Sequence, residues 1–165
     1  MSYITELREL IGHKRILLPG CIAFIRNAAG QILMQQRSYP YGKWGLPGGL
    51  MELDESTEET TRREVKEETG LVLGELSLFG VYSGEGYHCK AQNGDLFDVV
   101  TIVYSTDDYK GEVAVMDDES LSFEWFDLDK LPENIAGTHT EIIRDYIMRA
   151  NMKNEIAGQA RNTSI

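Results

Sequence analysis

Cysteine and histidine are scarce in this chain of 165 residues, and neither is spaced as in a typical metal site. The two cysteines, Cys21 and Cys89, stand in strand-like stretches with no CxxC or Cys/His spacing around them. The three histidines, His13, His88 and His139, are scattered along the sequence. This pattern does not predict a zinc site or thiol redox chemistry. We interpret the cysteines as buried thiols and assign no role to the histidines.

Long hydrophobic runs and an excess of positive charge are also missing. No window approaches the ~20 apolar residues that a membrane span needs, and no charged segment followed by an apolar run occurs near Met1. The net charge of −11 opposes a nucleic-acid groove built from Lys and Arg. We expect a soluble, cytoplasmic protein that binds neither a membrane nor a nucleic-acid duplex. An anionic ligand would need a bound divalent cation, which directs attention to acidic clusters.

Internal repeats, low-complexity tracts and long linkers are absent as well. With 42% hydrophobic residues, the chain is long enough to bury one core without disulfides. We expect one domain over residues 1–153, with a short N-terminal helix within residues 2–11 that stops at Gly12. A polar, flexible tail is expected over residues 154–165.

The apolar runs predict a sheet in the middle of the chain and a helix near its end. Residues 16–25 and 32–36 read as a hairpin around a turn at residues 27–30, and the glycine-rich residues 42–49 read as an ordered loop. Further strands are expected at residues 76–82, 97–104 and 121–126, with a turn at residues 92–95. From Thr140 to Ala150 an apolar stripe predicts the closing helix. This order indicates an α+β or α/β/α domain.

Acidic residues gather in a segment with clear helix boundaries. Ser56 and Glu59 form a capping-box pattern, and Gly70 provides the stop after Thr69. Within this helix, three glutamates fall within roughly a third of the circumference, so their carboxylates share one face: Glu64, Glu67 and Glu68. A solvated acidic face is the alternative, because each exposed like-charge pair costs only ~0.2 to 0.5 kcal/mol.

The residues before the helix favour a metal site. Gly48 and Gly49 expose backbone that can approach a ligand closely, so a carbonyl oxygen can join the carboxylates in coordination. Oxygen ligands without histidine or cysteine suit Mg²⁺, or Mn²⁺, rather than zinc.

The spacing of these residues resembles the Nudix box. Five residues separate Gly49 from Glu55, and seven more lead to the sequence Arg63-Glu64-Val65-Lys66-Glu67-Glu68-Thr69-Gly70-Leu71. The resemblance to the Nudix hydrolase superfamily extends over residues 14–150. It implies an α/β/α sandwich with a mixed central sheet, a loop-helix-loop formed by the box, and a C-terminal helix. It also implies metal-dependent hydrolysis of the pyrophosphate linkage of a nucleoside diphosphate derivative.

Carried onto this sequence, the resemblance implies specific roles. The implied metal ligands are the Gly48 carbonyl and the carboxylates of Glu64, Glu67, Glu68 and a later acid, for which Glu119 is the candidate. Asp117, Asp118 and Glu124 are its rivals. Glu64 is the first candidate for the base, with Glu67 and Glu119 as alternatives, because closely packed carboxylates titrate together. Structural roles fall to the orienting pair of Arg63 with Glu55 and to the box glycines Gly49 and Gly70.

The substrate is less well defined. Arg37 is a candidate phosphate contact or a surface arginine, and Trp44 and Tyr41 can stack on a base or pack structurally. The proline that marks ADP-ribose-specific relatives is absent, because no proline lies between Pro47 and Pro132. Tyr87 stands where relatives acting on dinucleoside polyphosphates carry a tyrosine. Nucleotide sugars, dinucleoside polyphosphates, nucleoside triphosphates and CDP-alcohols stay open.

Two further possibilities follow from the resemblance and the strand pattern. A Nudix fold can serve as a non-catalytic nucleotide-binding regulator, although such binders tend to lose box carboxylates and this box is intact. Exposed strands beside the turn at Asn93 and Gly94 could support a homodimer.

Overall fold

The structure is a computed structural model that describes residues 2–162 and contains thirteen helices and strands. The three helices are α1 (Tyr3–Ile11), α2 (Thr57–Thr69) and α3 (Gly137–Asn162). The strands are β1 (Ile16–Ile25), β2 (Ile32–Arg37), β3 (Trp44–Gly45), β4 (Gly48–Leu50), β5 (Val72–Leu73), β6 (Ser77–Tyr82), β7 (His88–Lys90), β8 (Leu96–Thr106), β9 (Tyr109–Lys110) and β10 (Ser120–Phe126).

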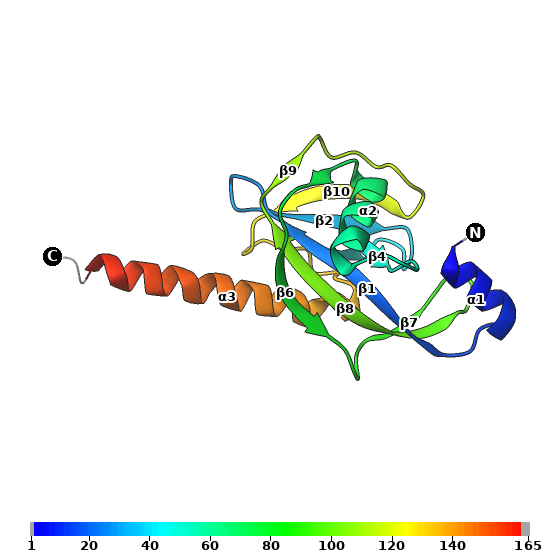
Figure 1. The fold of residues 1–165 in the computed structure, drawn as a ribbon. Coiled ribbons are helices and arrows are strands. Elements are labelled where there is room, and N and C mark those ends of the chain that lie inside the picture. Colours follow the sequence, from blue (N-terminus) through cyan, green and yellow to red (C-terminus); the bar gives the residue numbers. More distant parts are fainter. Residues whose placement is uncertain (1, 163–165) are drawn as a thin grey trace.

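The largest sheet is mixed and helices lie on either side of the strands, so the predicted α+β sandwich is confirmed (Figure 1). The largest sheet runs β4-β1-β8-β6 with β7 beside β8, and a second runs β10-β2-β3. Side chains on β1 alternate between two cores. Phe24 packs with Ile142 of α3, whereas Ile25 packs with Val65 of α2. Because both faces are covered, β1 reads as a nearly continuous apolar run.

The pairing of β1 corrects the predicted hairpin. β1 pairs in parallel with β8, from Ile16 opposite Phe97 to Ile25 opposite Thr106, and antiparallel with β4. Both edges of β1 are therefore occupied, so β2 pairs with β10 and β3 instead. The predicted turn is present. Beside it, Arg26 and Ile32 form an isolated β-bridge in place of the hydrogen-bonded ladder that a hairpin would have.

The glycine-rich segment over residues 42–49 is also more regular than predicted. It contains β3 and the start of β4, where Gly48 lies opposite Ile22 and Gly49 opposite Cys21. Gly48 has φ 145°, and a Cβ at this position would collide with the carbonyl oxygen of Cys21. The glycines therefore allow this strand to lie against β1, which a prediction based on turn propensity overlooks.

Helix α2 has the predicted ends. Ser56 accepts a hydrogen bond from the Glu59 backbone, the Glu59 side chain accepts one from the Ser56 backbone, and Gly70 ends the helix with φ 79°. Val65 is fully buried against the sheet. With its apolar face on the sheet, the helix directs its other faces toward the loop over residues 50–55 and toward solvent.

Helix α3 begins on the sheet and ends away from it (Figure 1). Tyr146 stacks on Phe24 with ring centroids 3.9 Å apart. The polar segment predicted to be a flexible tail from residue 154 is helical as far as Asn162, with exposed side chains from Asn151 onward. Residues 163–165 lie outside the described part. Within residues 2–162, no helix combines the length and apolar character needed to cross a membrane.

Candidate active site

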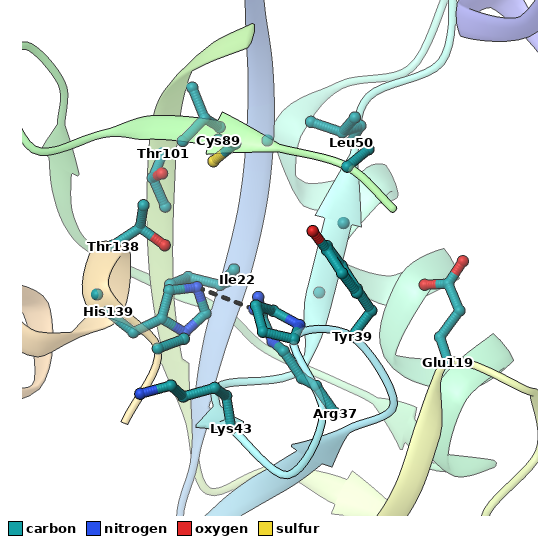
Figure 2. Close-up of a pocket in the computed structure, with 18 of the residues that line it drawn as sticks. Ile22, Arg37, Tyr39, Lys43, Leu50, Cys89, Thr101, Glu119, Thr138 and His139 are labelled. Carbon is teal, nitrogen blue, oxygen red and sulfur yellow. Dashed lines mark hydrogen bonds between the residues drawn. The ribbon is translucent and has the colours of Figure 1, made fainter. Parts of the chain in front are cut away.

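A cavity of about 600 Å³ opens beside the glycine strand β4 (Figure 2). Its walls come from β1, β2, β4, β7 and β8, from the end of α2 and from the start of α3. Apolar side chains line one part of it: Ile22, Leu50, Phe97 and Val99. Charged side chains line another: Arg37, Lys43, Glu68 and Glu119. The cavity thus offers both an apolar wall and opposite charges, as ligand sites usually do.

Glu68 is the most deeply buried carboxylate of the site, at 3% exposure. Its Oε2 accepts a hydrogen bond from the Gly48 backbone at 2.9 Å, and its Oε1 accepts one from the Gln35 side chain at 3.1 Å. Burial raises the pKa of Glu68 to about 8, against the opposing effect of these hydrogen bonds. A cation beside Glu68 would favour the charged form that burial disfavours.

Two further acids lie next to Glu68. Single carboxylate oxygens of Glu68, Asp117 and Glu119 all fall within 4.8 Å of one another. The later acid expected at Glu119 therefore lies near Glu68 of the helix, and its rival Asp117 falls within the same limit of 4.8 Å. Asp118 and Glu124 do not belong to this group. The three oxygen donors include no histidine or cysteine, a set that suits a hard divalent cation such as magnesium.

A buried hydrogen-bond chain brings these acids together. The Gln35 amide donates to Glu68 and also to the Ser120 hydroxyl at 2.7 Å. The Ser120 hydroxyl donates to Asp117, whose Oδ1 also accepts from the backbones of Glu119 and Ser120. The sequence analysis missed Gln35 and Ser120. The available signal was a polar Gln35 at an inward position of an apolar strand, where a polar group needs a partner.

Glu64 and Glu67 are arranged differently from the expected three-glutamate cluster. Arg63 Nη1 donates to Glu64 at 2.8 Å and to Glu67 at 3.2 Å. Glu67 points outward with a side chain that is 59% exposed, whereas Glu64 lies over Gly49, where a Cβ would collide with its carboxyl group. Burial raises the pKa of Glu64, with smaller raising effects from Glu67 and Glu119, while Arg63 opposes the shift.

The orienting pair of Arg63 and Glu55 is present. Arg63 donates from Nε and Nη2 to the two oxygens of Glu55, and Nη2 also donates to the Leu50 carbonyl. Glu55 accepts further bonds from the Glu52 backbone and the Thr60 hydroxyl. The Arg63 hydrogen bonds are the largest cause that lowers the pKa of Glu55 to about 2. This pair ties the loop before α2 to the helix that carries the acids.

The three predicted substrate contacts have different positions. Arg37 lines the cavity, with Nη2 3.2 Å from Nε2 of His139. Trp44 packs edge-on against Phe126, and Tyr87 is 4% exposed with its hydroxyl donating to Glu141. Neither Trp44 nor Tyr87 lines the cavity, so their positions do not support the predicted contacts. Both are bulky aromatic side chains that pack in the hydrophobic core cluster of the fold.

His139 is a cavity residue to which the sequence analysis assigned no role. It is 5% exposed in the first turn of α3, between the cavity and the core. Its spacing to Ile142, Ile143 and Tyr146 places it on the inward face of the helix, a signal that the sequence did contain.

The chain is similar in sequence and fold to several known proteins. The family model described as NUDIX domain matches residues 17–146. The chain is 38% identical to the ADP-ribose pyrophosphatase of Methanocaldococcus jannaschii, over 90% of this chain and 85% of that protein. It is 34% identical to the oxidized purine nucleoside triphosphate hydrolase of Danio rerio, over 62% of each chain. Among solved structures, a MutT NUDIX hydrolase from Burkholderia pseudomallei superposes with a TM-score of 0.66 and 32% identity, over 78% of this chain and 96% of that one.

Proposed function

The chain belongs to the NUDIX domain family and is a Nudix hydrolase, and on that basis we propose that it cleaves the pyrophosphate linkage of a nucleoside diphosphate derivative in a reaction dependent on a divalent cation, Mg²⁺ or Mn²⁺. The observation that carries this proposal is the position of Glu68. A buried carboxylate with two acids beside it borders a cavity of ligand size, and burial without a cation opposes its charge.

The cation would be held by Glu68 and Glu119, with Asp117 or Glu64 as the neighbouring ligand. The Gly48 carbonyl and Glu67 remain predicted ligands from the Nudix box. When bound, such a cation neutralises phosphate charge and lowers the pKa of a coordinated water.

The chain's own groups supply the proton transfer and the alignment. Glu64 is our candidate base, because it is partly buried and its raised pKa makes its carboxylate a better proton acceptor. Arg63 fixes Glu64 through the 2.8 Å hydrogen bond and is itself held by Glu55. Arg37 adds a positive group on the cavity wall, suited to a phosphate oxygen.

We propose ADP-ribose, or a related nucleoside diphosphate sugar, as the first substrate to test. The support is the relative from M. jannaschii, which is named as an ADP-ribose pyrophosphatase and aligns along most of both chains. The missing proline marker argues against strict ADP-ribose specificity. Dinucleoside polyphosphates and nucleoside triphosphates therefore belong in the same screen, the latter supported by the relative from D. rerio.

The test is a hydrolysis screen of these compounds with Mg²⁺ or Mn²⁺, using the wild type, Glu64→Gln, Glu68→Gln and the control Glu58→Gln. Glu58 lies on the same helix but pairs with Arg62 outside the cavity. We expect turnover by the wild type and the control, and a loss of at least about 100-fold in kcat in the two site variants. Full activity in both site variants would contradict the site. Tight nucleotide binding without turnover of any compound would instead indicate the regulator.

A further inference from the structure

His139 carries a buried ring whose hydrogen bonds define its tautomer. The backbone N–H of Leu46 donates to Nδ1 at 2.9 Å, so Nδ1 must present its lone pair. Burial lowers the pKa of His139 well below its ordinary value, so the ring is neutral. A neutral imidazole with an unprotonated Nδ1 carries its proton on Nε2.

The Nε2 proton has no acceptor in the described part of the chain. The atom 3.2 Å from Nε2 is Nη2 of Arg37, and a guanidinium has donors but no acceptor. Figure 2 shows the two side chains pointing toward each other at the cavity wall. Two donors therefore face each other at the cavity wall, from a buried His139 and a half-buried Arg37, and the buried Nε2–H in particular needs an oxygen as its acceptor.

The local backbone fixes this arrangement. A Cβ on Gly45 would lie 2.9 Å from Nδ1 of His139 and 3.0 Å from Nε of Arg37, so both side chains rest against a bare Cα. His139 is also held by the Leu46 backbone. Gly137 and Thr138, which open α3, line the cavity beside it, where the positive end of the helix favours an electron-rich group.

We propose that Arg37 and His139 form a two-donor clamp for one unprotonated oxygen of the substrate. Two nitrogens 3.2 Å apart form the base of a triangle whose apex places an oxygen at hydrogen-bonding distance from both. The inference rests on the proposed function for the identity of the ligand as a nucleotide. The oxygen belongs to a phosphate or to a nucleobase carbonyl, and an amino group at this position would oppose both donors.

The test observes the His139 ring directly. We would record the imidazole nitrogen and proton NMR signals of ¹⁵N-histidine-labelled full-length protein without divalent metal, while adding guanosine, adenosine, GMP, AMP or inorganic phosphate. If the clamp binds a phosphate oxygen, we expect the His139 Nε2–H signal to shift with both monophosphates. If the clamp binds a nucleobase carbonyl, we expect the same signal to shift with guanosine and GMP but not with adenosine or AMP. His13, which pairs with Asp95 outside the cavity, is the internal control.

Variants provide the second arm. His139→Leu removes the donor and is expected to weaken binding of the recognised nucleotide by about tenfold or more. His139→Gln, whose amide can accept from Leu46 and still donate, is expected to recover most of that loss.

The outcomes separate the clamp from the proposed function. A bound nucleotide that leaves the His139 signals unchanged would overturn the clamp, even if the enzyme hydrolyses its substrate. Shifted His139 signals in a protein that hydrolyses none of the screened compounds would support the clamp and overturn the proposed function.

Discussion

Glu68 shows how one residue couples stability to function. Its carboxyl group is removed from solvent and accepts two hydrogen bonds, yet its pKa is raised to about 8 because burial outweighs them. Between the ordinary value of 4.5 and about 8, the folded protein retains a proton that the unfolded chain has lost. Stability without metal therefore decreases as the pH rises through this interval.

We predict that Glu68→Gln stabilises the metal-free protein at pH 8 by about 1–3 kcal/mol. The amide of the variant cannot ionise. The variant therefore lacks the free-energy cost of keeping a buried carboxyl group protonated at a pH where the same group is ionised in the unfolded chain. Urea unfolding in EDTA at several pH values measures this, with Glu58→Gln as the control. Added Mg²⁺ should stabilise the wild type but not the variant. A Glu68→Gln protein that is less stable at pH 8 and still responds to Mg²⁺ would refute this role.

Glu55 has the opposite shift, because its hydrogen bonds with Arg63 favour the charged form. Its pKa falls from 4.5 to about 2, so its contribution is fully present above pH 4.5 and is lost as the pH falls toward 2. We predict that Glu55→Gln costs about 1–3 kcal/mol at pH 7 and that the difference from the wild type shrinks below pH 4.5. Unfolding curves at decreasing pH give the difference, and a constant gap down to the lowest pH with folded protein would refute this origin.

At the scale of an element, the glycine strand β4 decides where the acids of α2 lie. Gly48 donates its N–H to Glu68, and Gly49 leaves room for the Glu64 carboxyl group. The strand thus sets the positions of the Glu64 and Glu68 carboxyl groups, which the helix by itself would not fix. Helix periodicity could predict which face is acidic but not how closely a neighbouring backbone approaches it.

We predict that Gly49→Ala displaces Glu64 and lowers kcat by about 10-fold or more while the protein stays folded, because its Cβ would collide with that carboxyl group. Gly158→Ala, in an exposed part of α3 with no neighbour within 4 Å, is the control and should keep full activity. Turnover of the substrate found in the screen is measured together with circular dichroism. Normal kcat in Gly49→Ala would show that Glu64 tolerates displacement or is not the base.

At the scale of the whole molecule, α3 divides into a part that completes the core and a part that does not. Ile142, Ile143 and Tyr146 pack against the sheet, while the side chains from Asn151 to Asn162 are exposed. The exposed part includes the large apolar side chains of Met152 and Ile156, which are 57% and 65% exposed.

We predict that removing residues 154–165 changes the free energy of unfolding by less than about 0.5 kcal/mol and leaves kcat unchanged, because exposed side chains contribute little. Tyr146→Ala, which removes the ring stacked on Phe24, should cost about 3 kcal/mol. Chemical denaturation of both variants is the measurement. A large loss of stability on truncation would show that the exposed half of α3 has a partner, such as a second copy.

The sequence by itself determined the ends of α2 and the side of that helix on which its glutamates lie. Ser56, Glu59 and Gly70 specify the ends of α2 through hydrogen bonds between residues close in the chain, whereas the pairing of Glu55 with Arg63 was expected only from the resemblance to the Nudix box. The capping hydrogen bonds could be predicted because the two partners of each lie within four residues of one another in the sequence.

Only the tertiary structure decided what surrounds that helix. Three contacts join residues more than 30 positions apart in the sequence. They are the parallel pairing of β1 with β8, the approach of Glu119 to Glu68 through Gln35, and the contact of Arg37 with His139. Such contacts depend on which strand edges remain free once the sheet has assembled, and periodicity along one segment does not record that choice.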